Sequence, residues 1–120
     1  DHPDLIAATR DALEQTGKPF VIENVQEARH LLRFPLLLCG STFGLPIRRH
    51  RYFECHGLPL IMVPPCQHRR SDFSHDHGAK QTETVYRDAM YCHWMTVQEA
   101  RQAIPPAYTE YIGRQLIKVL

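Results

Sequence analysis

The pattern of apolar and polar positions predicts an α/β chain. Pro3 to Thr16 carries an apolar stripe at helical spacing, and Gly17 is a natural C-terminal stop with Pro19 just beyond it. Phe20 to Val25 is apolar up to Glu23, as expected of a strand buried on both faces of a sheet. A helix, a tight connection and a strand together make an αβ unit. The stripe consists of Leu5, Ile6, Thr9, Ala12 and Leu13.

Shorter elements follow in the middle of the chain. Gln26 to Arg33 predicts a short helix or a loop, and Leu36 to Cys39 is a short apolar run. Arg48 to Glu54 alternates as a strand or a pair of strands does. Leu58 to Val63 is a further apolar run, which Pro64-Pro65 ends.

The composition of the chain changes after Val63. Cys66 to Asp88 is polar and nearly free of aliphatic residues, which predicts a long loop or a small irregular insert. Thr96 then opens a helix, with Glu99 placed for a capping box. That helix should stop before Pro105-Pro106, and a last helix should run from about Ala107 to Val119.

Composition narrows the class of protein. A chain of 120 residues with 43% apolar content indicates one globular domain. The net charge of +1 excludes a global attraction to DNA or membranes, although Arg outnumbers Lys and suits phosphates and base edges. A GC-rich genome explains the same bias. The chain has neither a signal peptide nor the roughly 18 apolar residues of a membrane span, so we expect a cytoplasmic setting. There the cysteines should be reduced: Cys39, Cys55, Cys66 and Cys92.

Two segments carry candidate chemistry. Glu23 and Asn24 end a buried strand, where α/β folds place ligands, and burial would raise the pKa of Glu23 enough for it to donate a proton. A carboxylate that caps the next turn is the alternative.

Arg49 and Arg51 would share one face of a later strand and could bind a carbonyl and a phosphate, with Arg48 on the other face. A solvated edge strand protected by charge is the alternative here.

Cysteines and histidines raise the question of a metal. Cys66 with His68, Cys55 with His56, or the run 75–77 could ligate zinc, and Cys66 after two prolines could be a nucleophile. None of these has the spacing of a closed zinc site. We therefore expect no metal.

Three ordered segments resemble the motifs of DNA cytosine-5 methyltransferases. Glu23-Asn24-Val25 resembles motif VI, and Arg49-His50-Arg51 resembles the Arg-x-Arg of motif VIII. Ala103-Ile104-Pro105-Pro106, with Tyr111-Ile112-Gly113 after it, resembles motif X. The segment 38–45 is similar to phage-encoded members. The three segments cover most of the chain in the order of the family.

The resemblance implies roles for the catalytic candidates. Glu23 would contact N3 and the exocyclic amine of a cytosine flipped from the duplex, and Asn24 would hold the strand end. Arg51 would donate to the cytosine O2, and Arg49 would support that loop or a phosphate. The family nucleophile, a Cys in a Pro-Cys motif before Glu-Asn-Val, and the Gly-rich cofactor loop have no counterpart upstream of Glu23. Pro65-Cys66-Gln67 has the letters of the nucleophile motif but falls after motif VIII.

The resemblance also implies a fold and ligands. The chain would be part of a Rossmann-like S-adenosylmethionine-dependent methyltransferase sheet with an irregular recognition insert and C-terminal helices. Residues 1–56 would be the later half of the catalytic domain, 57–95 the insert and 96–120 the closing helices. S-adenosylmethionine would bind near Ala103, Ile104 and Pro105. DNA would contact Arg48, Arg69 and Arg70.

The expected function is that of a fragment of a methyltransferase acting on double-stranded DNA in a bacterium or a phage-infected host. The parent would be the enzyme, since this chain lacks the nucleophile and the cofactor loop. Two alternatives are a non-catalytic DNA-binding or regulatory remnant of that fold and a Cys/His metal-binding module. A missing N-terminal half or a second chain should cover an exposed sheet edge, or the chain should self-associate.

Overall fold

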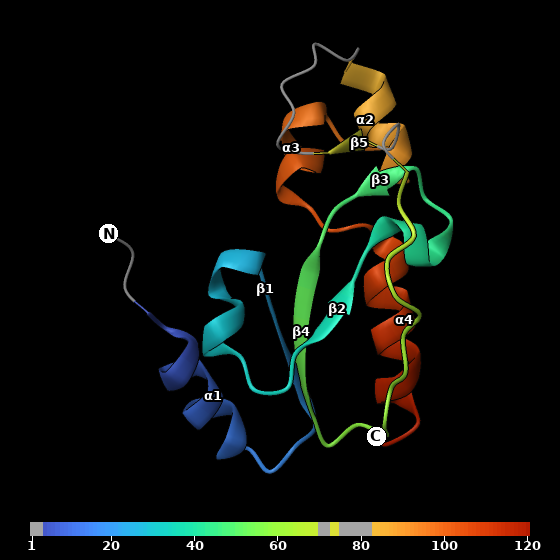
Figure 1. Ribbon diagram of the computed structural model, residues 1–120. Coiled ribbons are helices and arrows are strands. Elements are labelled where there is room, and N and C mark those ends of the chain that lie inside the picture. Colours follow the sequence, from blue (N-terminus) through green and yellow to red (C-terminus); the bar gives the residue numbers. More distant parts are fainter. Residues whose placement is uncertain (1–3, 70–72, 75–82) are drawn as a thin grey trace.

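The computed structural model describes residues 4–69, 73–74 and 83–120. Its centre is a three-stranded antiparallel sheet in the order β1 (Phe20–Asn24), β4 (Arg51–His56) and β2 (Leu36–Leu38). Helices α1 (Ile6–Glu14) and α4 (Pro106–Ile117) lie on opposite sides of this sheet (Figure 1). The predicted α/β class is confirmed, whereas the finer expectation of a Rossmann-like sheet stays a prediction.

One face of the sheet is covered by α1 and by the 3-10 helix η1 (Gln26–Leu31). Ile6 and Leu13 of α1 pack against a buried cluster of Ile22, Leu32 and Tyr52. The predicted stripe is wrong at its other three positions, since Leu5, Thr9 and Ala12 are exposed. The buried residue of α1 is Arg10 instead, because it has an acidic partner inside the fold.

That partner is Glu54 of β4. Arg10 donates from Nε and Nη2 to the two carboxylate oxygens at 2.6 and 2.7 Å, and from Nη2 to the carbonyl of Leu31 at 2.8 Å. The Arg33 amide and the His56 ring also contact the carboxylate of Glu54. The network ties α1, the end of η1 and the centre of the sheet together.

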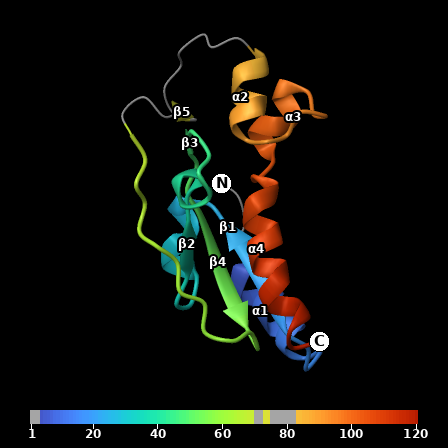
Figure 2. The ribbon, with the colours of Figure 1, turned by 90° about the vertical axis from the view of Figure 1, so that its right-hand side faces the viewer.

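The opposite face packs against α4. Leu38 and Phe53 of the sheet form a buried cluster with Tyr108 and Ile112 of the helix. Segment 57–69, which has no regular secondary structure, runs back from the end of β4 past β2 (Figure 2). Its apolar residues join the same cluster, so this segment is held by packing: they are Leu58, Ile61 and Val63.

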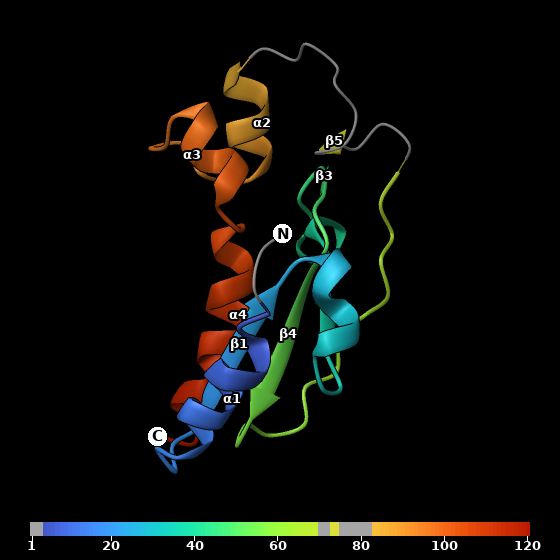
Figure 3. The same ribbon diagram turned by 90° about the vertical axis from the view of Figure 1, so that its left-hand side faces the viewer.

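A smaller unit lies beyond the far end of the sheet (Figure 3). Here β3 (Ile47–Arg48) pairs in parallel with β5 (Phe73–Ser74), next to α2 (Glu83–Ala89) and α3 (Val97–Gln102). The prediction of an irregular segment through Asp88 is wrong for α2, because Tyr86, Ala89 and Met90 give that stretch a packing face. The capping box of Thr96 and Glu99 is confirmed. None of the described helices is long and apolar enough to cross a membrane.

Candidate functional site

Glu23 and Arg51 meet at one end of the sheet. The register pairs Glu23 with Phe53 and Asn24 with Tyr52, so Arg51 lies one position beyond the last paired residue of β1. Arg51 Nε is 3.1 Å from Glu23 Oε1, and the side chains are 18% and 35% exposed. Alternation along β4 puts Arg51 on the face that carries Phe53 and α4. Two residues far apart in sequence thus form an ion pair in which Arg51 is half-buried and Glu23 is exposed.

The surroundings of Glu23 favour its protonated form more than water does. Burial raises the pKa of Glu23, and the positive charges of Arg51 and Arg49 offset part of that rise. A carboxyl group of this kind can donate a hydrogen bond to a ring nitrogen. Asn24 lies beside it and accepts a hydrogen bond from the Val25 amide at 2.8 Å. This bond holds the end of β1 where the chain turns into η1.

Arg49 points into the protein rather than toward a ligand. It is 2% exposed and donates to the Tyr86 hydroxyl at 2.8 Å and to the carbonyls of Arg101 and Ala103 at 2.7 and 2.5 Å. Burial lowers the pKa of its guanidinium. Its own carbonyl accepts from the Tyr108 hydroxyl at 2.6 Å. Arg49 therefore connects the sheet to the smaller unit and to the start of α4.

The residues expected near a cofactor are used in packing. Ala103 packs against the cluster of the smaller unit, Ile104 against the cluster under α4, and Pro105 is fully buried. Ala103 and Ile104 remain partly exposed. Contact with that cofactor stays a prediction.

The DNA-binding candidates are only partly described. Arg48 is half-buried in β3 and Arg69 is exposed at the end of segment 57–69. Arg70 and residues 75–77, where a second metal pair was considered, lie outside the described residues.

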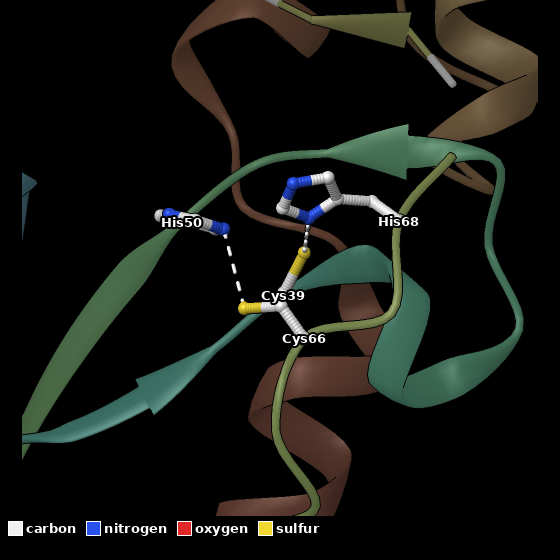
Figure 4. A group of neighbouring side chains, drawn as sticks. All are labelled: Cys39, His50, Cys66 and His68. Atoms are coloured by element: carbon white, nitrogen blue, oxygen red, sulfur yellow. Dashed lines mark hydrogen bonds between the residues drawn. The ribbon is translucent and has the colours of Figure 1, made fainter. Parts of the chain in front are cut away.

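A cluster of two cysteines and two histidines contradicts the expectation that no metal binds. The Sγ atoms of Cys39 and Cys66 and one ring nitrogen each of His50 and His68 all lie within 4.8 Å of one another. Cys39 Sγ is 3.6 Å from His68 Nδ1, and Cys66 Sγ is 3.4 Å from His50 Nε2 (Figure 4). Cysteine thiolates and imidazoles are the ligands that zinc prefers. A site that can hold a metal ion is therefore present.

Two features of the fold bring these four side chains together. Cys39 directly follows β2 and His50 directly precedes β4, so the register that pairs Leu38 with Arg51 leads to them next. Cys66 and His68 stand two residues apart on an extended segment, which puts their side chains on one side of the backbone. The sequence signal was the Cys66-x-His68 pair. Its partners could not be found by spacing, since each half is completed by residues of another element.

The surroundings of the cluster favour the neutral form of His50 and the thiol form of Cys66. Burial lowers the pKa of His50, and the neighbouring His68 and Arg48 lower it further. Burial also raises the pKa of the Cys66 thiol, and a negative charge on Cys39 adds to that rise. All four cysteines of the chain are free.

The chain was compared with protein families, curated proteins and solved structures, and no similar protein was found. No protein-family model matches the chain, and neither a curated protein nor a solved structure matches it. The geometry of the Glu23–Arg51 pair and of the Cys/His cluster is thus what bears on function.

Proposed function

We propose that this chain carries the target-base side of the active site of a DNA (cytosine-5)-methyltransferase, on a Rossmann-like sheet that residues outside this sequence complete. The observation that carries the proposal is the Glu23–Arg51 pair at 3.1 Å. In the family that the sequence resembles, motifs VI and VIII supply an acid and an arginine to one flipped cytosine. Antiparallel pairing of β1 with β4 supports the proposal, because it joins the two motif-like segments on neighbouring strands.

The chemistry of the pair suits a cytosine ring. A cytosine must leave the base stack before its carbon 5 can be reached. Glu23, whose pKa burial raises, would donate to N3 and so make carbon 6 more electrophilic. Arg51 would donate to O2, where negative charge develops as a nucleophile adds to carbon 6. A base entering between the two side chains would exchange their ion pair for one hydrogen bond to each.

Arg51 is held for such a contact. It uses Nε for Glu23 and Nη1 for the carbonyl of His50 at 2.9 Å. Among the described residues, neither contact uses Nη2. This nitrogen is the donor that we assign to O2 of the base.

The remaining parts of the active site would come from outside these residues. The nucleophile and the cofactor loop would be supplied by residues outside this sequence or by a second chain. β1 supports this, since it ends the described three-stranded sheet and pairs with β4 on one side. Further strands would join at that edge, next to Glu23.

A non-catalytic DNA-binding or regulatory module of the same fold is the second candidate. The observation that favours it is that Pro105 is fully buried and that Ala103 and Ile104 pack partly into apolar clusters, so each has a structural role without a cofactor. In that case Glu23 and Arg51 would be a structural ion pair at the end of the sheet.

The test is methyl transfer by the full-length protein that contains this sequence. We expect Glu23→Gln to lower the transfer of labelled methyl groups to mixed-sequence duplex DNA by about 100-fold or more, because general acid assistance contributes about that much. DNA affinity, measured by fluorescence anisotropy, should change little. Glu27→Gln is the matched control, since Glu27 is exposed in η1 and loses the same charge.

Two other outcomes would contradict the catalytic role of Glu23 or the enzymatic function of the chain. Equal activity of the Glu23 and Glu27 variants would mean that Glu23 is structural. DNA binding without any methyl transfer by the unsubstituted protein would favour the regulatory module.

A further inference from the structure

The Cys/His cluster shares no residue with the proposed base site and has its own chemistry. Its members come from the end of β2, the start of β4 and segment 57–69. Cys39 is fully buried, and the other three are half-buried. Two weak thiol–imidazole hydrogen bonds alone do not explain why both pairs converge on one point.

The distances match those around a tetrahedral zinc ion. With Zn–S of about 2.3 Å and Zn–N of about 2.0–2.1 Å, the sulfur–nitrogen edges of such a site are about 3.6 Å. The two sulfur–nitrogen distances observed are 3.6 and 3.4 Å. All remaining distances among the four ligand atoms are at most 4.8 Å, so small side-chain adjustments suffice.

We propose that Cys39, His50, Cys66 and His68 form a structural zinc site that fastens segment 57–69 to the end of the sheet. Four protein ligands complete a tetrahedron and leave no open position for a substrate, so the role is structural. Two thiolates and two imidazoles select zinc over the oxygen-preferring ions magnesium and calcium.

Contacts around the cluster support its geometry. The Ser41 hydroxyl accepts a hydrogen bond from the Gln67 amide at 3.0 Å, which holds the residue between the two ligands of the segment. Tyr111 of α4 donates to the carbonyl of Met62 at 3.0 Å and so holds the same segment four residues before Cys66. Zinc would add a firm link where the apolar contacts of the segment end.

Zinc would also support the neighbouring ion pair. His50 precedes Arg51, and Arg51 donates to its carbonyl. Fixing the His50 ring to an ion fixes the backbone that Arg51 uses. This consequence does not depend on what Arg51 binds.

The first experiment measures metal in the 120-residue chain. The chain is purified under reducing conditions, mixed with a small excess of zinc and desalted, and its metal content is measured by mass spectrometry. We expect about one zinc per chain. Cobalt(II) in place of zinc should give the intense visible bands of a tetrahedral thiolate site and lose them when zinc is added. A zinc content equal to the buffer blank, or the pale spectrum of octahedral cobalt, would overturn the proposal.

Paired variants then locate the site. Cys66→Ser and His68→Ala should weaken zinc retention against a chromogenic chelator by at least about tenfold. Cys55→Ser and His93→Ala are the matched controls, since neither residue belongs to the cluster. Equal retention by ligand and control variants would overturn the proposal.

A ligand exchange covers the case in which the loss variants misfold. His68→Cys keeps a zinc ligand at the same position. It should retain about one zinc per chain and strengthen the sulfur-to-cobalt charge-transfer band, because a third thiolate is added. Two results together would contradict the assignment of His68: the His68→Cys chain folds but loses its metal, and any cobalt that still binds shows an unchanged charge-transfer band. A Cys39–Cys66 disulfide that forms in place of zinc binding under the same reducing conditions would contradict the site as a whole.

Discussion

Glu54 is a buried residue that stays charged. Burial by itself would raise its pKa, but hydrogen bonds from Arg10, the Arg33 amide and His56 outweigh that effect and hold the pKa of Glu54 at about 2. Its side chain is 1% exposed, and that of Arg10 is 6% exposed. A buried pair of this kind is costly to break from one side, because the remaining charge loses its partner.

Glu54→Gln should therefore destabilise the fold. We expect the free energy of unfolding at pH 7 to fall by about 3 kcal/mol, because Arg10 would be left buried without a counter-charge. Urea denaturation followed by circular dichroism measures the change. Glu14→Gln is the control: its pair with Arg33 is 3.4 Å long and largely exposed, so we expect less than about 1 kcal/mol. If the two substitutions lowered the free energy of unfolding equally, the buried Arg10–Glu54 pair would be no more stabilising than the exposed Glu14–Arg33 pair.

The same carboxylate predicts how stability depends on pH. The folded pKa of Glu54 is about 2, below the roughly 4.3 of an unfolded glutamate. Its contribution is therefore fully present above the unfolded pKa and is lost as the pH falls through the folded one. Urea midpoints of the unsubstituted chain should fall between pH 5 and 2 by more than those of Glu54→Gln. Parallel pH profiles of the two proteins would contradict this.

At the scale of elements, Gly40 explains how η2 (Gly40–Phe43) fits beside β3. A Cβ at this position would lie 2.2 Å from the carbonyl oxygen of Ile47, which is backbone and cannot move aside easily. The Leu45 amide donates back to the Gly40 carbonyl at 3.0 Å and closes the turn. The close approach of the two backbones sets the path of the chain between Cys39 and His50.

Gly40→Ala should therefore cost about 1–3 kcal/mol, the usual range for overpacking. Gly113→Ala is the matched control within α4, where an added Cβ meets nothing within 4 Å. That substitution should stabilise the chain by about 0.5–1 kcal/mol, because alanine loses less backbone entropy in a helix. Thermal unfolding of both variants should show a lower melting temperature for Gly40→Ala and a higher one for Gly113→Ala. A neutral Gly40→Ala would mean that the turn rearranges at no cost.

Local signals in the sequence predicted the elements well. Thr96 and Glu99 lie within one turn of each other, so the cap of α3 needed no tertiary information. Gly17, with a φ of 65°, follows α1 as its sequence position indicates. The faces of the elements were harder to predict. In α1 the position that is buried is Arg10, and only the presence of Glu54 on β4 makes its burial favourable.

At the scale of the whole molecule, Arg49 joins the sheet to the smaller unit. Its guanidinium reaches the Tyr86 hydroxyl of α2, the Arg101 carbonyl in the last turn of α3 and the Ala103 carbonyl just after that helix. Its Nε has no hydrogen-bond partner among the described residues. A planar group with several fixed donors is needed to span these acceptors.

Arg49→Lys should loosen the smaller unit without unfolding the sheet. One ammonium group cannot reach all three acceptors, so we expect local opening of α3 to become easier by about 2 kcal/mol. Hydrogen exchange measured by mass spectrometry should rise in α3 and change little in β4. Arg114→Lys is the control, because Arg114 is exposed and pairs only with Glu110 among the described residues. Uniform exchange changes throughout the chain would contradict a local role.

The two candidate sites differ in how far the sequence could predict them. Glu23 was found from its place at the end of an apolar run, and Arg51 from a motif-like segment, since each signal is local. The Cys/His cluster was missed, because neither Cys39 nor His50 stands at zinc-site spacing from Cys66-x-His68. Arg49 was expected to support the neighbouring loop or a phosphate, and the interior carbonyls that hold it could not be predicted from the sequence.

The sequence by itself determined most of the helices and strands, except β5 and α2, and it showed which side chains can offer acid, base or metal-binding chemistry. These properties depend on residues within a few positions of one another. Only the tertiary structure decided which of those side chains meet: Glu23 with Arg51, Arg10 with Glu54, and the four residues of the Cys/His cluster. The reason is that strand register and the return path of segment 57–69 bring together atoms whose separation along the chain carries no local signal.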